Sequence, residues 1–196
     1  MSRITVVGSF SMDLTVTMSQ FPKEGQTIIG KKMLKNPGGK GANQCIAAAR
    51  LGGDVEMIGM VGNDENGRII KDLFASEGVN IEHVLTTDKE PTTIALIEID
   101  DTAQNKIVVV PAANFVYSVE DLHAVKDVIA NTEMVVAQLE MRLDVMEELA
   151  KNGISMDAMK DKSYIRQYTW DKLLIAPVPY DAMHVFRNAI FKIKII

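Results

Sequence analysis

The sequence predicts an α/β fold in which helices cover both faces of a parallel sheet. In the first half of the chain, buried-strand patterns alternate with helical patterns, in the order strand, exposed strands, helix, strand, helix. The runs at 4–7 and 55–59 are short and apolar, which is typical of strands covered on both faces. Glycines follow most of these patterns, as short connections between elements require.

The N-terminal elements begin with the apolar run at 4–7, which ends at Gly8 and predicts a buried strand. Apolar and polar residues then alternate over 13–18, which predicts a strand with one solvent-facing side. A turn at 21–25 leads into residues 27–29, where we expect a second exposed strand.

A glycine-rich turn at 36–41 precedes the first helix. Three of the four residues 38–41 are glycine, which disfavours the interior of a helix or strand. An apolar stripe at helical spacing follows, made by Ala42, Cys45, Ile46 and Ala49. We expect a helix over 42–51 that is ended by Gly52 and Gly53. Its free N–H groups suit an oxygen-rich or anionic ligand, although an ordinary tight turn is the alternative.

The later elements follow from capping residues and apolar patterns. Asn66 is expected to cap a helix that ends at Gly78, and Ser118 to cap another. The remaining predicted elements are a hairpin of 92–99 with 106–110, a strand at 134–137 and a helix at 143–150.

Composition indicates an ordinary globular domain. The chain has 196 residues, 47% apolar and 24% charged, with a net charge of −5, which argues against nucleic acid or an anionic membrane as the main partner. No apolar run is long enough to cross a bilayer, and the first residues lack the features of a signal peptide, so we expect a cytoplasmic protein. Cys45 lies on an apolar stripe, which favours a buried thiol. The three histidines, His83, His123 and His184, show no metal-ligand spacing, so no metal site is assigned.

Four short segments are more specific than the element pattern. They read GSFSMD at 8–13, PGGKGANQ at 37–44, GMVGNDENG at 59–67 and VAQLE at 136–140. In this order and spacing, over about residues 4–150, they resemble the ribokinase-like, or PfkB, family of sugar kinases, and come nearest to its ribokinases. The resemblance implies a three-layer α/β/α sandwich with a small β-sheet lid over the sugar, at about residues 12–35 and 92–110. It also implies a homodimer through the lid strands.

The resemblance implies a sugar-binding site at the carboxyl ends of the strands, where ligands of open α/β sheets bind. The positions that match the substrate-binding residues of the family are Ser11, Asp13, Gly39, Lys40, Gly41, Asn43 and Glu140, with Asn114 a less specific match. Ordinary alternatives are a turn-forming Asp13 and solvated charges at Lys40 and Glu140. Ser11 stands where ribokinases usually have asparagine, so fructose or a nucleoside stays open beside ribose.

The catalytic aspartate that the family carries in a Gly-Ala-Gly-Asp motif has no counterpart in this sequence. Gly153 is the only glycine after Gly78, and the Asn-x-x-Glu motif of the family is absent as well. We therefore assign no catalytic residue and expect a chain truncated before the catalytic motifs. One alternative is the substrate-binding half of a kinase that uses ATP and Mg²⁺, with a monovalent cation possible in the full-length family. The other is a non-catalytic product that binds sugar or dimerises.

Two regions are expected along the chain. Residues 1–150 read as the sugar-binding part with its lid strands, and 151–196 as a divergent tail. Within the tail, 151–170 match nothing in the family pattern. The resemblance returns weakly in a strand at 173–179, a helix at 182–190 and a strand at 193–196.

Overall fold

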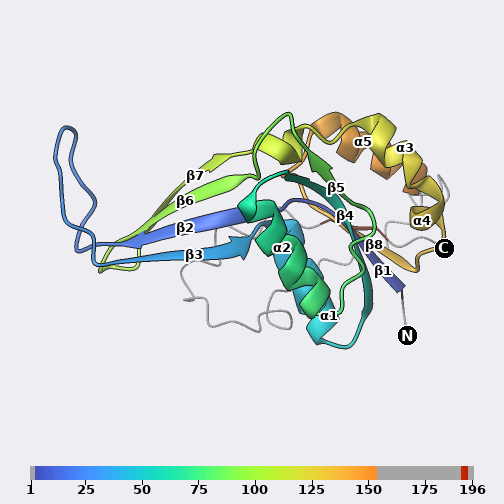
Figure 1. Cartoon of the computed structure of the whole chain (residues 1–196), viewed down its shortest axis with the longest axis horizontal. Helices are drawn as coiled ribbons and strands as arrows, with labels where there is room; N and C mark the ends of the chain where they lie inside the picture. Colours follow the sequence, from blue (N-terminus) through green and yellow to red (C-terminus); the bar gives the residue numbers. More distant parts are fainter. Residues whose placement is uncertain (1–2, 154–190, 194–196) are drawn as a thin grey trace.

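Two β-sheets and their flanking helices make up the part of the chain that the structure describes (Figure 1). The structure is a computed structural model in which residues 3–153 and 191–193 are described. The elements in chain order are β1 (Arg3–Val7), β2 (Ser11–Thr17), β3 (Lys32–Gly38), α1 (Lys40–Arg50), β4 (Asp54–Gly62), α2 (Glu65–Ser76), β5 (Val84–Thr87), β6 (Ile94–Ile99), β7 (Asn105–Val110), the 3₁₀ helix η1 (Ala112–Phe115), α3 (Val119–Ala124), α4 (Lys126–Ala130), β8 (Met134–Ala137), α5 (Leu143–Gly153) and β9 (Phe191–Ile193).

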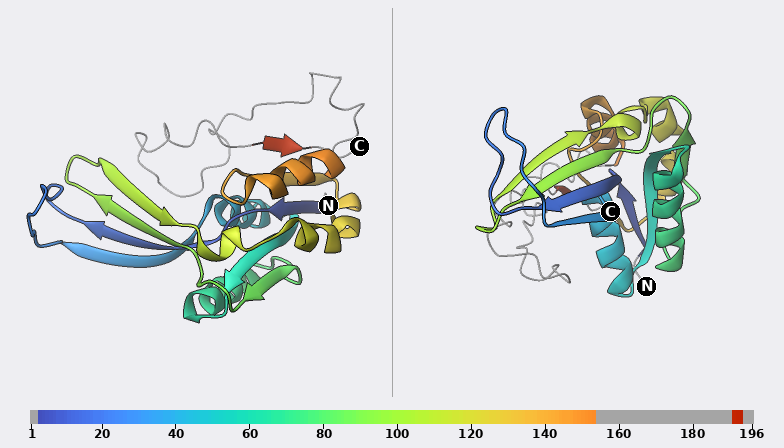
Figure 2. Two further views of the ribbon diagram at one scale, coloured as in Figure 1. Left: turned by 90° about the horizontal axis from the view of Figure 1, so that it is seen from above. Right: turned by 60° about the vertical axis from the view of Figure 1, so that its left-hand side comes forward.

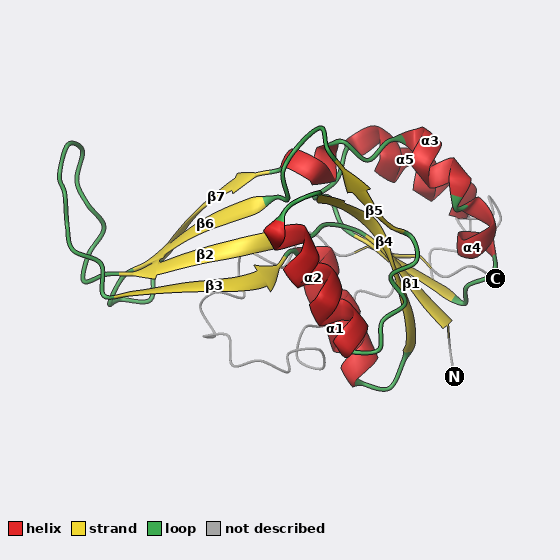
Figure 3. Ribbon diagram, viewed as in Figure 1, coloured by secondary structure: helices red, strands yellow, loops and turns green. Residues whose placement is uncertain are grey.

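The main sheet has the strand order β5-β4-β1-β8-β9. Its first four strands are parallel, and β9 pairs antiparallel with β8. Helices α1 and α2 cover one face and α3, α4 and α5 cover the other, as the views in Figures 2 and 3 show. This arrangement confirms the predicted α/β sandwich, because a parallel sheet needs helices on both faces to bury its strands.

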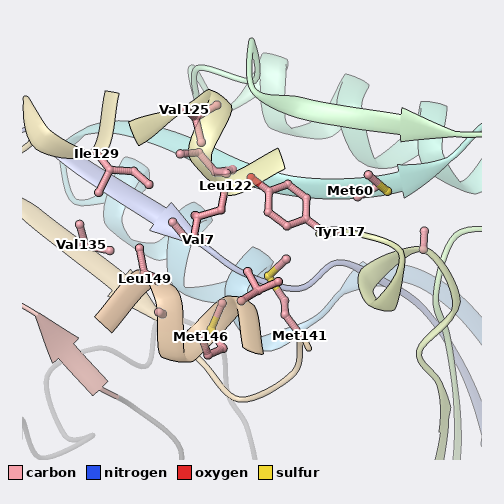
Figure 4. Close-up of a cluster of buried hydrophobic side chains, with 14 residues drawn as sticks. Val7, Met60, Tyr117, Leu122, Val125, Ile129, Val135, Met141, Met146 and Leu149 are labelled. Atoms are coloured by element: carbon pink, nitrogen blue, oxygen red, sulfur yellow. The ribbon is translucent and has the colours of Figure 1, made fainter. Parts of the chain in front are cut away.

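Alternate residues of the strands supply the two halves of the core. Val6 packs with Cys45, Ile70 and Phe74 under α1 and α2, whereas its neighbour Val7 packs on the opposite side of the sheet. The second cluster joins the sheet to α3, α4 and α5 (Figure 4), and its labelled members are Val7, Met60, Tyr117, Leu122, Val125, Ile129, Val135, Met141, Met146 and Leu149. The period of two along each strand therefore produces a sheet that is apolar on both faces.

The second sheet, with the order β3-β2-β6-β7, extends away from the main sheet and is called the lid below (Figure 1). Strands β2 and β6 are parallel, and the outer pairs β2–β3 and β6–β7 are antiparallel. Residues 15–17 and 94–99 thus lie in the lid, which confirms the predicted lid sheet and the hairpin that closes it.

The second lid strand was predicted in the wrong place. Residues 27–29 are not a strand, and Ile29 is 88% exposed; the strand is β3, which pairs with β2 from Lys32 to Gly38. Asn36 and Pro37, expected in a turn, belong to this strand. Proline is tolerated there because β3 lies at the edge of the lid, where a missing N–H breaks no ladder.

Helix starts were predicted with mixed success. Ser118 caps α3 in a reciprocal arrangement with Asp121, as expected. The cap of α2 is Asp64 rather than Asn66, because the Asp64 carboxylate accepts from the Gly67 N–H at 2.8 Å. Strand β5 was not predicted, and the single helix expected after Ser118 is divided at Val125 into α3 and α4.

Most of the predicted tail lies outside the described residues. This applies to the strand at 173–179, the helix at 182–190 and residues 194–196, while Ile193 ends the short strand β9. Helix α5 continues to Gly153, three residues beyond its predicted end. Among residues 3–153 and 191–193, no helix is long and apolar enough to span a membrane.

Candidate functional site

The predicted site lies where the main sheet meets the lid. The chain leaves β1 at Val7, crosses the amino end of α1 through Gly8, Ser9 and Phe10, and enters the lid as β2. Strand β8, which pairs with β1, ends at Ala137 and is followed by the segment that carries Glu140. The Asp13 carboxyl of the lid lies within the electrostatic influence of Glu140, whose negative charge helps to raise the pKa of Asp13.

Glu140 is held by three donors. The Ser9 hydroxyl and the Lys40 backbone N–H both donate to Glu140 Oε2, at 2.7 and 3.0 Å. The Lys40 ammonium forms an ion pair with Glu140 Oε1. Ser9 Oγ in turn accepts from the Gly41 N–H at 3.3 Å. Ser9 and Glu140 thus satisfy the first free N–H groups of α1, where a negative charge is favourable.

Burial by itself would raise the pKa of the Glu140 carboxyl, but the hydrogen bonds from Lys40 and Ser9 outweigh it. The pKa of Glu140 is therefore lowered from its ordinary value. An ionised carboxylate at this position can accept hydrogen bonds from hydroxyl groups of a ligand.

Asp13 is in the opposite electrostatic condition. Its pKa is raised, first by burial and further by the negative charge of Glu140, although the Ser11 hydroxyl donates to Asp13 Oδ1 at 2.5 Å and opposes the shift. A Cβ built on Gly38, which lies opposite Ser11, would be 2.1 Å from Asp13 Oδ2. The glycine thus leaves the space that the Asp13 carboxylate occupies.

Gly39 and Gly41 allow the start of α1 to approach the segment after β1. Gly39 has φ +102°, and a Cβ there would lie 2.8 Å from the Ser9 carbonyl oxygen and 2.9 Å from the Phe10 Cα. At Gly41 a Cβ would lie 2.6 Å from the Ser9 N. Side chains at either position would push apart the two segments that hold Glu140.

Other predicted residues lie nearby without joining this network. Asn43 is exposed on the first turn of α1, and its backbone N–H donates to the Gly39 carbonyl at 2.9 Å. Asn114 is buried, and its amide exchanges hydrogen bonds with the Phe10 backbone at 3.1 and 2.8 Å. Asn114 therefore fixes the chain between β1 and β2, because its amide is bonded to the Phe10 backbone.

Sequence reasoning missed two contributors to the site, Ser9 and Gly38. Ser9 is buried and joins Glu140 to α1, yet one serine beside a glycine gives no periodic signal. Gly38 was predicted only as part of a turn and of the motif at 37–44, because its closeness to Asp13 depends on strand register. Among the described residues, no cluster of three histidine, cysteine or acidic side chains could hold a metal ion.

Comparison with known proteins identifies relatives of this chain. The family model described as pfkB family carbohydrate kinase matches residues 1–187. Ribokinase from Bacillus subtilis is 40% identical over 164 residues, which cover 80% of this chain and 53% of that protein. Ribokinase from Haemophilus influenzae is 36% identical over 157 residues, which cover 78% of this chain and 51% of that protein.

A solved structure agrees with the sequence matches. Arabidopsis thaliana ribokinase complexed with ribose and ATP superposes with a TM-score of 0.65 at 30% identity, covering 78% of this chain and 52% of that one. The chain thus spans about half the length of the ribokinases it matches.

Proposed function

The chain belongs to the pfkB family of carbohydrate kinases, and from this premise we propose that it forms the sugar-binding part of a ribokinase-type kinase. The proposed reaction of the complete enzyme is phosphoryl transfer from ATP to ribose, giving ribose 5-phosphate. The observation that carries the proposal is the set of donors that holds Glu140 at the amino end of α1, with the Asp13 carboxyl near enough for the charge of Glu140 to raise its pKa. Fructose and nucleosides are the alternative acceptors.

A sugar presents several hydroxyl groups, so its site needs acceptors on more than one side. Glu140 supplies one from the main sheet, and its lone pairs are oriented by Ser9 and Lys40. Asp13 supplies another from the face of the lid that also carries Asn36 and Ala95. A sugar hydrogen-bonded to both carboxylates would join the lid to the main sheet, and it would replace water beside two partly buried charges.

Lys40 and the glycines at 38, 39 and 41 would act by placing these acceptors. The lysine neutralises Glu140, which allows a second carboxylate to stand nearby. The glycines leave room for Asp13 and for the approach of α1 to Ser9. In our proposal Ser11 orients Asp13, and Asn43 contacts the sugar from the exposed side of the first turn of α1.

ATP and Mg²⁺ are proposed as cosubstrate and cofactor because the Arabidopsis relative was solved with ribose and ATP. None of the residues assigned above is proposed to hold ATP or Mg²⁺. No residue of this chain is proposed to bind a monovalent cation either. Phosphoryl transfer also needs a group that accepts the proton of the attacking hydroxyl. The Gly-Ala-Gly-Asp motif that carries this base in the family is absent from the 196 residues. We therefore infer that this polypeptide binds sugar without transferring phosphate at an enzymatic rate.

The test measures binding and turnover separately on the purified 196-residue chain. Ribose, fructose and adenosine are titrated by calorimetry, and ATP consumption is followed with each. We expect saturable binding that is tightest for ribose and weaker by about tenfold or more in Asp13→Asn and Glu140→Gln, since each removes a hydrogen bond to a charged group. The matched control is Asp72→Asn, an exposed carboxylate on α2.

Three outcomes would overturn parts of this proposal. If Asp13→Asn and Glu140→Gln bind ribose as tightly as Asp72→Asn does, the sugar does not bind at this junction. Turnover between about 1 and 1,000 per second would show that the chain contains a catalytic base that we have not identified. If fructose or adenosine binds most tightly, then fructose or a nucleoside, rather than ribose, is the substrate.

The lid also suggests a homodimer. Through the strand register, Leu14, Leu96 and Val108 share the lid face that lies opposite to Asp13. Leu96 and Val108 are 46% and 61% exposed, and a groove of about 250 Å³ on this face is lined by Leu14, Val16, Met18, Met33, Leu96, Ile97 and Glu98. We propose that this apolar face, rather than the strand edges alone, contacts a second copy of the chain.

Sedimentation equilibrium on Leu96→Glu tests the dimer. A charge on the apolar face should shift the protein to monomer, whereas Leu51→Glu, at a residue 60% exposed beyond the end of α1, should leave the distribution unchanged. A wild-type chain that stays monomeric at every concentration would contradict the proposal.

A further inference from the structure

A cleft lies at the amino ends of the main-sheet strands, whereas the proposed sugar site lies at their carboxyl ends. It is formed where β1 and β4 begin, beside the connection that enters β5 and beneath α4. Figure 1 shows α4 and the start of β1 at the end of the molecule away from the lid. We call it the basal cleft; its volume is about 290 Å³ and it is lined by Arg3, Glu56, Asn80, Glu82, His83, Asp127, Val128 and Asn131.

Glu56 is the unusual residue of the basal cleft. It is only 3% exposed, although it carries a carboxyl group near the start of the sheet strand β4. Its Oε1 accepts from Asn80 Nδ2 at 3.2 Å and lies 3.5 Å from His83 Nε2. Its Oε2 has no hydrogen-bond partner within the described chain. Burial raises the pKa of this carboxyl, while the charges of His83 and Arg3 oppose the shift.

A buried carboxylate oxygen without a donor is costly, so the missing partner should be a strong donor. The charges of the basal cleft indicate the kind of donor. Glu56, Glu82 and Asp127 bring three carboxyl groups to the lining, against the single guanidinium of Arg3 and the imidazole of His83. A cationic N–H donor is favoured because it would satisfy Glu56 and reduce the repulsion between its acidic neighbours.

A bare metal ion fits this cleft poorly. In the part of the chain that the structure describes, no three acidic, histidine or cysteine side chains are gathered closely enough to coordinate one. The volume of about 290 Å³ is that of a small-molecule site rather than of an ion, and Val128 provides an apolar wall. The amide groups of Asn80 and Asn131 add polar contacts for a ligand of several atoms.

We propose that the basal cleft binds a small molecule carrying a primary ammonium group, with Glu56 accepting a hydrogen bond from that group and Glu82 and Asp127 adding to the attraction. The proposal is independent of the sugar site, because the basal cleft lies where β1 and β4 begin, whereas Ser9 and Glu140 follow the ends of β1 and β8. An ammonium group has three N–H donors, so one can reach the buried Glu56 while the others face the exposed carboxylates or water.

The test uses NMR titration of the full 196-residue chain with n-propylammonium chloride. Matched titrations use n-propanol, which has the same apolar chain without the charge, and potassium chloride at equal ionic strength. We expect saturable shifts of the backbone amides of Glu82, His83 and Asp127 with the ammonium compound alone. Glu56→Gln should weaken its binding by about tenfold, and Glu82→Gln by a few fold, the scales of a hydrogen bond to a charged group and of an exposed charge pair.

Glu147→Gln is the control, because this exposed carboxylate on α5 lies outside the cleft lining. If Glu56→Gln unfolds the chain, the exposed Glu82→Gln substitution still carries the test. Binding of n-propanol with equal strength, saturation by potassium chloride, or equal ammonium binding in the glutamate variants and the control would each overturn the proposal. So would the absence of saturable shifts with n-propylammonium.

Discussion

The two sheets of this chain differ in how their apolar residues are covered. In the main sheet Ile58 and Val135 are completely buried, because helices pack on both faces. In the lid, Leu96, Val108 and Val110 are 46, 61 and 53% exposed, although the strands are as rich in aliphatic residues. The main sheet is thus stabilised within the described chain, whereas the lid exposes apolar surface that we propose is covered by a second copy of the chain.

The proposed sugar site takes one carboxylate from the lid and one from the segment that follows the main-sheet strand β8. Glu140, beyond β8, is fixed by Ser9, the amino end of α1 and Lys40. Asp13, on β2 of the lid, receives its one described side-chain hydrogen bond from Ser11, two residues along the same strand. In our proposal the first carboxylate is preorganised by the fold, and the second is completed by the sugar.

The largest expected contrast is between core positions of the two sheets. Ile58→Ala should lower the free energy of unfolding by about 2–5 kcal/mol, because it leaves a cavity in a closely packed core. Val108→Ala should lower it by less than about 1 kcal/mol, since the side chain already faces solvent. Urea denaturation at low protein concentration, where association is minimal, compares the two.

Equal losses in the two variants would show that the lid is covered even in the monomer. A greater loss for Val108→Ala only at high protein concentration would instead support the proposed dimer, because association adds to apparent stability.

A smaller contrast separates two glycines that both have positive φ. Gly39→Ala combines backbone strain of about 1–3 kcal/mol with contacts of 2.8–2.9 Å to the Ser9–Phe10 backbone, at the junction of the two sheets. Gly52→Ala, with φ +85° and no atom within 4 Å of the added Cβ, carries strain of about 1–2 kcal/mol alone. We expect the first to abolish ribose binding and the second to preserve it in a somewhat less stable protein.

Thermal denaturation and ribose titration measure both effects. If Gly39→Ala binds ribose as the wild-type chain does, the approach of α1 to Ser9 is not needed for the site.

The sequence predicted the main sheet well because its elements depend on local patterns. The apolar runs at β1 and β8, the stripe around Cys45 and the Ser118 cap each act within a few residues. The predicted lid strands depended on alternation, which survives where one face is wet. It failed at β3, because Asn36, Pro37 and Gly38 are turn-forming residues that are held extended by pairing with β2.

The composition of the site could be predicted only in part. Asp13, Lys40 and Glu140 were predicted from family motifs; the structure pairs Lys40 with Glu140, and the charge of Glu140 acts on the pKa of Asp13. Ser9, Gly38 and the orientation of Asn114 depend on contacts across 104 to 131 positions or on strand register, for which a single sequence holds no local signal. Asn66 was predicted as the cap of α2, although Asp64 was also expected in a turn or capping role; both residue types cap well, and the geometry selects Asp64.

The smallest expected effects concern the pH dependence of the two site carboxylates. The folded-state pKa of Glu140 is lowered, so its stabilising contribution is present above the ordinary carboxyl pKa and is lost as pH falls through the folded value. Glu140→Gln should therefore cost about 1–2 kcal/mol at pH 7, the scale of a hydrogen bond to a charged group, and progressively less in acid.

Asp13 has the opposite sign, because its folded-state pKa is raised by burial and by Glu140. Its ionisation opposes folding at neutral pH, and this cost disappears as pH falls through the folded value toward the ordinary one. Asp13→Asn should therefore raise the free energy of unfolding at pH 7 by less than about 1 kcal/mol, because the charge is partly solvated. The melting temperature should rise slightly at pH 7 and stay unchanged near pH 3.5. Melting curves from about pH 3.5 to 8 compare the variants with Asp72→Asn, which should follow the wild type at every pH. If Asp13→Asn destabilises the chain at pH 7, the Ser11 contact outweighs burial, and the lid carboxylate is as firmly preorganised as Glu140.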